Sequence, residues 1–203
     1  MIDLSFKTYT RFDVDHIRQT LLAIYAEVYR ERLDEPFTTL SEFDDRLSRY
    51  VLAPQWECVL GMDGDNPVGY AFGYTLQPGA RWWDGLLDEV DSGAIVESGH
   101  RTFALNELMV REPWRGTGCA RRIHDELTSH RTEERVALLV EANHPKVRRT
   151  YESWGYVFLA QIRPDFPDAP ILDVMLMSLS ATLRGRRERA GRRPEPTTRR
   201  GPE

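Results

Sequence analysis

The chain has 203 residues, of which 41% are hydrophobic and 29% are charged, and this composition is typical of a soluble globular protein with one domain. It contains no apolar run of the roughly 18 residues needed for a membrane span, no signal-peptide pattern, and only two cysteines, too few for a disulfide framework or a cysteine metal cluster. We therefore expect a cytoplasmic protein that has no metal and no membrane association.

The net charge of −5 is unevenly distributed along the chain. Residues 184–203 contain eight arginines and three glutamates, which gives +5 and leaves −10 on the rest. We expect one domain over residues 1–180, followed by an Arg-rich, disordered tail over residues 181–203. An acidic domain favours a cationic substrate such as an amine and argues against nucleic-acid binding, although recruitment of nucleic acid by the tail stays open as an alternative.

Hydrophobic periodicity predicts the first elements of the chain. Alternation over residues 2–6 indicates a strand, and apolar spacing over residues 17–28 indicates a helix. The segment Thr39-Leu40-Ser41-Glu42 is a capping-box pattern, which predicts the start of a second helix. Residues 56–62 and 68–76 are predicted strands, joined by a turn rich in Asp, Gly and Asn.

Residues 77–101 form a long connection that contains several glycines and two adjacent tryptophans, Trp82 and Trp83. We expect a loop with one short helix around Leu86. Long connections in compact domains are often functional, and four acids near the tryptophans suggest a wall that binds a cationic substrate. The alternative is a surface flap packed by its own aromatic side chains.

The stretch over residues 105–127 predicts a strand, a glycine loop and a helix. An apolar run ends before Pro113, the sequence Arg115-Gly-Thr-Gly-Cys-Ala120 follows, and Ala120, Ile123 and Leu127 have helical spacing. Glycines allow close approach of a ligand, and a helix N-terminus offers unpaired N–H groups. The sequence therefore predicts a cradle for a phosphate or diphosphate.

The remaining elements complete a mixed α/β sheet. Residues 135–141 form a continuous apolar strand, residues 145–154 a short helix that ends at Gly155, and residues 156–159 and 171–179 two final strands. His124 and His130 are expected on the polar face of a helix, because no second ligand lies at metal spacing.

The pattern Val110-x-x-Pro113 followed by Arg115-x-x-Gly118-x-Ala120 resembles the acetyl-coenzyme A (acetyl-CoA) loop of the GNAT superfamily of N-acetyltransferases. The ending Tyr151-x-x-x-Gly155-Tyr156 is similar to a second motif of that family. The resemblance implies the GNAT acyltransferase fold: a mixed, mostly antiparallel sheet with helices on both faces and a gap between the strands at 102–111 and 135–141.

The resemblance also implies site residues. The diphosphate would be held by main-chain N–H groups of Gly116, Thr117, Gly118, Cys119 and Ala120, with added charge from Arg115 and Arg121. The strand backbone at Met109 and Val110 would pair with pantetheine, and one of these N–H groups would polarise the acetyl carbonyl. Tyr151 would protonate the departing thiolate. The family has an asparagine seven residues before this tyrosine; here His144 occupies that position, and Asn143, one residue earlier, is the candidate cofactor contact.

The predicted base is Glu107, which lies on the strand that would face the acetyl group. Strand alternation places Glu107 and Asn106 on opposite faces, so Asn106 is an alternative for facing the substrate. Glu97 and His100 are further candidates for the base. Cys119 lacks a neighbouring nucleophile motif, so we expect no acyl-cysteine.

These features predict an acetyl-CoA-dependent N-acetyltransferase that acts on a primary amine, with small cationic molecules as the favoured substrates, by direct attack in a ternary complex. Trp82, Trp83 and Asn106 are the predicted substrate contacts. Two alternatives stay open: a non-catalytic acyl-CoA-binding sensor, and a protein acetyltransferase that modifies N-termini or lysines. A homodimer is compatible with the resemblance, because dimers are common in that family.

Overall fold

The computed structural model describes residues 3–166 and 168–179. The tail predicted over residues 181–203 lies outside this part of the chain. Within the described residues, no helix is long and apolar enough to cross a membrane.

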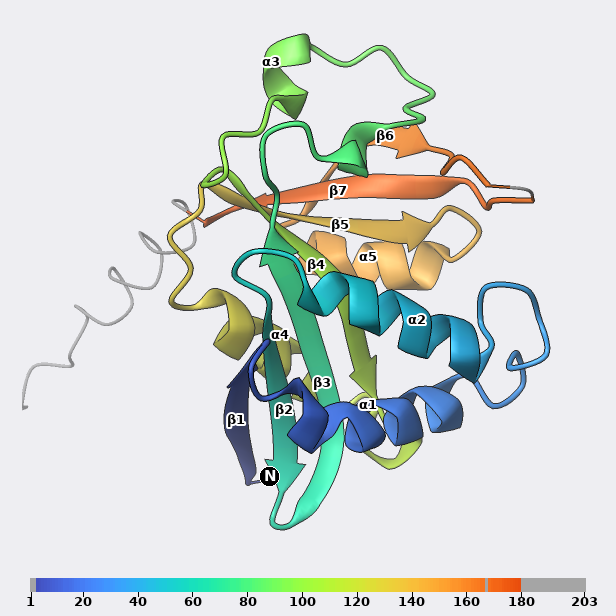
Figure 1. Ribbon diagram of the computed structural model, residues 1–203, viewed down its shortest axis with the longest axis vertical. Helices are drawn as coiled ribbons and strands as arrows, with labels where there is room; N and C mark the ends of the chain where they lie inside the picture. Colours follow the sequence, from blue (N-terminus) through green and yellow to red (C-terminus); the bar gives the residue numbers. More distant parts are fainter. Residues whose placement is uncertain (1–2, 167, 180–203) are drawn as a thin grey trace, which may run out of the picture.

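The described chain forms one seven-stranded sheet with helices packed on both of its faces (Figure 1). The strands lie in the order β1-β2-β3-β4-β5-β7-β6, and only the β4–β5 pair is parallel. This confirms the predicted mixed, mostly antiparallel α/β sheet. The strands are β1 Leu4–Thr10, β2 Glu57–Asp63, β3 Asn66–Thr75, β4 Thr102–Val110, β5 Arg135–Glu141, β6 Val157–Ile162 and β7 Leu172–Ser178.

Two helices cover each face of the sheet because successive strand residues point to opposite sides. Helices α1 (Val14–Val28) and α2 (Leu40–Val51) pack on the face that includes Tyr70 and Phe72. Helix α4 (Cys119–Thr128) packs on the opposite face, against residues that include Val59 and Ala71. Helix α5 (Pro145–Ser153) adds Tyr151 to that second layer.

The capping box predicted at the start of α2 is confirmed. The Thr39 hydroxyl oxygen accepts a hydrogen bond from the Glu42 N–H at 3.2 Å, and the Thr39 hydroxyl donates to the Glu42 carboxylate at 2.6 Å. The cap fixes where α2 begins, and with it the α1–α2 connection that borders the functional site.

The long connection between β3 and β4 is only partly as predicted. It contains a 3-10 turn, η1 (Arg81–Trp83), and a single helical turn, α3 (Ser92–Ile95). The helix predicted around Leu86 is wrong, because Leu86 forms an isolated β-bridge with Ile162 at the edge of β6. Gly85 permits this course: it has φ +83°, and a Cβ there would lie 2.1 Å from the Arg163 carbonyl oxygen.

Strands β4 and β5 are paired only at their beginnings. The parallel register joins Thr102–Ala104 to Arg135–Ala137 and stops there, although both strands continue. The sheet is therefore split beyond Ala104, at the place where the family resemblance implied a gap.

Candidate active site

The gap between β4 and β5 opens into a cavity of about 410 Å³. Residues of β4, β5, α1, α2 and α5 contribute to its wall. The chemically relevant lining residues are Glu107, Tyr151, Asn106, Arg46 and Glu141. We refer to it as the catalytic cavity.

A β-bulge in β4 directs two polar residues into this cavity. Phe72 of β3 pairs with Glu107, but the next residue, Gly73, pairs with Leu105, so that Asn106 is the extra residue. Asn106 and Glu107 both line the catalytic cavity. The expectation that they lie on opposite faces is therefore wrong, because the bulge interrupts the alternation. The sequence signal was Gly73, where a Cβ would lie 2.2 Å from the Ala104 carbonyl oxygen.

The surroundings of Glu107 raise its pKa into the neutral range. Burial raises the pKa of Glu107 to about 7, and the positive charge of Arg46 opposes this rise. Arg46 is held in turn, because its guanidinium donates to the Phe37 carbonyl oxygen at 2.6 Å. A carboxyl group with this pKa can accept and release a proton near pH 7.

Tyr151 projects from α5 into the same cavity. Burial, and to a smaller degree the charge of Glu107, raises the pKa of the Tyr151 phenol, which therefore stays protonated at neutral pH. Its ring makes edge contacts with Trp154, at a centroid distance of 5.1 Å, and with Tyr156, at 5.4 Å. The phenol is thus a proton donor on a ring fixed by its neighbours.

A buried polar chain supports the rings around Tyr151. His124 of α4 is 0% exposed, its Nε2 lies 2.9 Å from the Tyr156 hydroxyl, and its Nδ1 lies 3.1 Å from the Asp125 carboxylate. Although burial opposes it, hydrogen bonds from His124 and Arg121 hold the pKa of Asp125 below its ordinary value. The prediction that His124 lies on a polar helix face is wrong. This series of hydrogen bonds connects α4 to the neighbours of Tyr151.

The glycine loop has the backbone of an anion cradle. Gly116 and Gly118 have φ values of +75° and +87°, and a Cβ added at either position would meet no atom within 4 Å. In the described structure, the N–H groups of Gly116, Thr117 and Gly118 find no hydrogen-bond acceptor. The first turn of α4 adds further N–H donors at its N-terminus. The predicted cradle for a diphosphate fits this arrangement.

The side chains of the loop mostly support the loop itself. The Arg115 Nε donates to the Val110 carbonyl oxygen at 3.0 Å, and the Thr117 hydroxyl donates to the Trp114 carbonyl oxygen at 2.6 Å. Cys119 is buried, with its sulfur 3.1 Å from the Thr117 hydroxyl. Arg121 forms an ion pair with Asp125 at 2.9 Å, which leaves the main chain as the better candidate for anion binding.

The register of β4 decides which of its N–H groups face the gap. The Arg111 N–H donates to the Val68 carbonyl oxygen at 2.9 Å, in the same register that pairs Val110 with Gly69. Because orientation alternates along an antiparallel pair, the peptide groups of Met109 face β3, whereas those of Leu108 and Val110 face the gap. The predicted pantetheine contact is thus available at Val110 but not at Met109, and Leu108 was missed because sequence alone does not give register.

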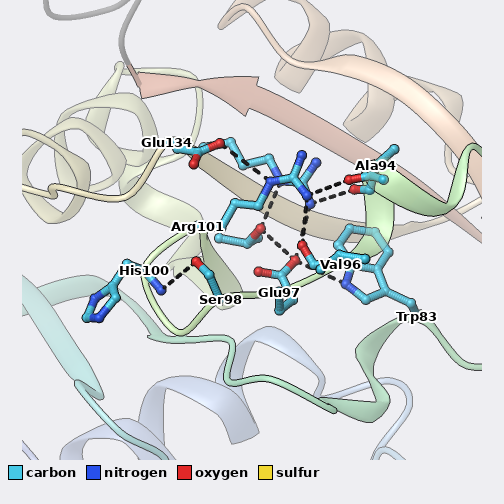
Figure 2. A network of polar contacts seen from close by, with 11 residues as sticks. Trp83, Ala94, Val96, Glu97, Ser98, His100, Arg101 and Glu134 are labelled. Carbon is cyan, nitrogen blue, oxygen red and sulfur yellow. Dashed lines mark hydrogen bonds and ion pairs between the residues drawn. The ribbon is translucent and has the colours of Figure 1, made fainter.

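Trp83 and Glu97 belong to a structural network rather than to the cavity (Figure 2). One Glu97 carboxylate oxygen accepts hydrogen bonds from the Trp83 indole at 3.1 Å, the Thr102 hydroxyl at 2.8 Å and the Arg135 guanidinium at 3.2 Å. Trp83 is a core residue, 7% exposed. The prediction that Trp83 contacts the substrate is therefore wrong, and so is the alternative that Glu97 acts as the base. Figure 2 shows the exposed His100 ring directed away from this network.

Two other predicted site residues, Trp82 and Asn143, do not line the catalytic cavity that the described residues form. Trp82 lines a second cavity of about 320 Å³, together with Asn106. Asn143 is exposed in the turn before α5 and lines neither of these two cavities in the described structure. Its neighbour His144 lines the catalytic cavity instead, with Nε2 3.2 Å from the Glu141 carboxylate.

Comparison with known proteins identifies a family. The model of the acetyltransferase (GNAT) family matches residues 18–156. No curated protein matches the chain. No group of three or more His, Cys, Asp or Glu side chains suited to a metal ion occurs within the described residues.

Solved structures share the fold at low sequence identity. A chimera of spermidine N-acetyltransferase SpeG from Vibrio cholerae and hSSAT is 15% identical, with coverage of 89% of this chain and 98% of the other and a TM-score of 0.57. Ard1 from Thermoplasma volcanium is 13% identical, with coverage of 86% and 97% and a TM-score of 0.54. An acetyltransferase from Thermus thermophilus is 17% identical, with coverage of 86% and 96% and a TM-score of 0.55.

Proposed function

Because the chain belongs to the acetyltransferase (GNAT) family, we propose that it transfers the acetyl group of acetyl-CoA to a primary amine in a ternary complex. The observation that supports this most is one cavity, at the split in the sheet, lined by both Glu107 and Tyr151. A non-catalytic sensor would have no need of a carboxyl group with a pKa near 7 in the same cavity as a phenol.

The main chain of two elements would hold acetyl-CoA. The N–H groups of the glycine loop and the first turn of α4 would bind the diphosphate, at Gly116, Thr117, Gly118, Cys119 and Ala120. Leu108 and Val110 would offer backbone groups to the pantetheine arm and a donor to the acetyl carbonyl oxygen. When bound, acetyl-CoA supplies an activated thioester.

Glu107 would act as the general base and Tyr151 as the general acid of the transfer. Glu107 accepts a proton from the acceptor ammonium and releases it to water, which gives a neutral amine. As the nitrogen–carbon bond forms and the carbon–sulfur bond breaks, Tyr151 gives its proton to the departing sulfur and is reprotonated by the proton that the attacking nitrogen loses. The products are an amide, a free thiol and one proton.

The acceptor is proposed to be a small cationic amine. The net charge of −10 over residues 1–183 favours such a substrate. Trp82 and Asn106 line the second cavity beside the catalytic one and are candidate substrate contacts. We place the reaction in the cytoplasm.

Thiol release from acetyl-CoA in the presence of a panel of primary amines tests this function. We expect amine-dependent release that saturates with both substrates. Binding of acetyl-CoA without thiol release for any amine, including peptides with free N-termini and lysines, would contradict catalysis and favour a sensor.

A further inference from the structure

The second cavity adjoins the catalytic cavity. Asn106 and Leu139 line both of them, so an acceptor molecule could extend from one into the other. Tyr50 of α2 also lines the second cavity, and the charge of Glu107 contributes to the raised pKa of Tyr50 after burial, which is the main cause. We call it the distal cavity.

The two cavities differ in charge. The distal cavity is lined by two carboxylates, Asp84 and Asp165, and one guanidinium, Arg81, which pairs with Asp84 at 2.8 Å. The fully ionised set therefore has a net charge of −1. The catalytic cavity is lined by Arg32 and Arg46 together with Glu107 and Glu141, and its net charge rises when Glu107 is protonated. A second positive charge on the acceptor is thus better placed in the distal cavity.

Aromatic rings and an amide complete the wall of the distal cavity. Tyr50 and Tyr74 lie 5.9 Å apart at an interplanar angle of 34°, and Trp82 lines the same space. Aromatic faces attract ammonium groups. The Asn106 amide, which forms a side-chain hydrogen bond with Tyr74, lies where the two cavities meet.

We propose that the acceptor is an aliphatic diamine or longer polyamine, with its reacting nitrogen at Glu107 and a second ammonium group in the distal cavity. This inference rests on the proposed function and specifies its substrate class. Asp84 and Asp165 supply the charge, and Tyr50, Tyr74 and Trp82 supply the aromatic surface.

Matched amines test the inference. Diamines from diaminopropane to diaminooctane are each compared with the monoamine of the same chain length, and kcat/KM is measured by thiol release from acetyl-CoA. We expect the best diamine to exceed its monoamine by at least about tenfold, the order given by one desolvated cation–aromatic contact with a neighbouring carboxylate.

Variants locate the second ammonium. Asp84→Asn combined with Asp165→Asn should lower kcat/KM for the best diamine about tenfold, close to the value for the monoamine. Glu89→Gln is the matched control, because Glu89 is an exposed acid of the same connection that lines neither cavity in the described structure. It should leave kcat/KM for both amines unchanged.

The outcomes separate the two proposals. Equal kcat/KM for diamines and monoamines would overturn the diamine and leave the acetyltransferase standing, and a preference that survives the double substitution would overturn the distal cavity as its site. No thiol release with any amine would overturn both. A diamine preference lost in the double variant and retained in Glu89→Gln supports the inference.

Discussion

Glu107 is half-buried, and the loss of solvent around its carboxyl group raises its pKa to about 7. If it is the base, kcat/KM should rise with pH up to about 7 and then level off as Glu107 ionises. Glu107→Gln should lower kcat/KM about 100-fold or more and remove this limb of the profile. Steady-state rates across this pH range check the prediction, and an unchanged limb in the variant would assign the base elsewhere.

The same carboxyl group should make the free energy of unfolding depend on pH. Activity should rise with pH as Glu107 ionises, whereas stability should fall. Its pKa is raised from 4.5 to about 7, so between these values the folded state binds more protons than the unfolded state. Stability should therefore fall as pH rises through this window, by about 3 kcal/mol for this group, and Glu107→Gln should remove that part of the dependence. Urea unfolding of both proteins below and above the window measures it. Parallel pH dependences in the two proteins would contradict the raised pKa.

Removing the Tyr151 hydroxyl should slow the reaction without weakening acetyl-CoA binding. Tyr151→Phe removes the proton donor but keeps the ring, so kcat should fall about 100-fold while the dissociation constant of acetyl-CoA stays within about twofold. Tyr9→Phe, on the outer strand β1, is the matched control and should be neutral. Thiol release and calorimetry measure the two quantities. An unchanged kcat would exclude Tyr151 as the acid.

At the scale of elements, the glycine loop should be sensitive to one methyl group. Gly118→Ala places a Cβ at φ +87°, which costs about 1–2 kcal/mol, and puts the methyl where a ligand would approach the main chain. Gly64→Ala is a matched control, with φ +59° and equally open space in the β2–β3 turn. Both variants should lose similar stability, but only Gly118→Ala should weaken acetyl-CoA binding, by about tenfold.

Calorimetric titration of the two glycine variants distinguishes strain from ligand contact. Equal weakening of acetyl-CoA binding in both would mean that destabilisation, rather than the loop, is responsible. Unchanged acetyl-CoA affinity in Gly118→Ala would show that the glycine loop does not bind the diphosphate.

The β3–β4 connection should depend on Glu97. Its side chain is 2% exposed, and removing it leaves the largely buried Arg135 guanidinium without its carboxylate, so Glu97→Ala should cost about 3–5 kcal/mol. Glu134→Ala, which removes an ion pair with Arg101 whose carboxylate is 71% exposed, should cost less than about 1 kcal/mol. Urea unfolding compares the two variants. Equal losses would show that the network in Figure 2 does not hold the connection.

Local patterns predicted several of these elements but not their irregularities. The capping box at Thr39 and the left-handed glycines of the loop are short-range features, and both are found in the structure. The bulge at Asn106 has only an indirect signal in the sequence, the strand glycine Gly73, because its position depends on the pairing of β4 with β3. Leu86 joined the edge of β6 instead of a helix for the same reason.

At the scale of the whole molecule, the order of strands and helices was enough to predict the fold class, because a strand–loop–helix unit and a final antiparallel pair restrict the topology. The burial of His124 was not predictable, since its partner Tyr156 is 32 residues away in the sequence. The two cavities arise in the same way from distant segments. The proposed chemistry therefore depends on the split of the sheet as much as on any motif.

An amide NMR titration of the full chain with acetyl-CoA tests directly whether the glycine loop and β4 hold the cofactor. We expect the largest shift changes at the N–H groups of residues 116–121 and at Leu108 and Val110, where the loop and the open edge of β4 offer donors. Shift changes absent from these residues, or centred on the separate cavity lined by Trp56 and Arg131, would contradict this binding mode.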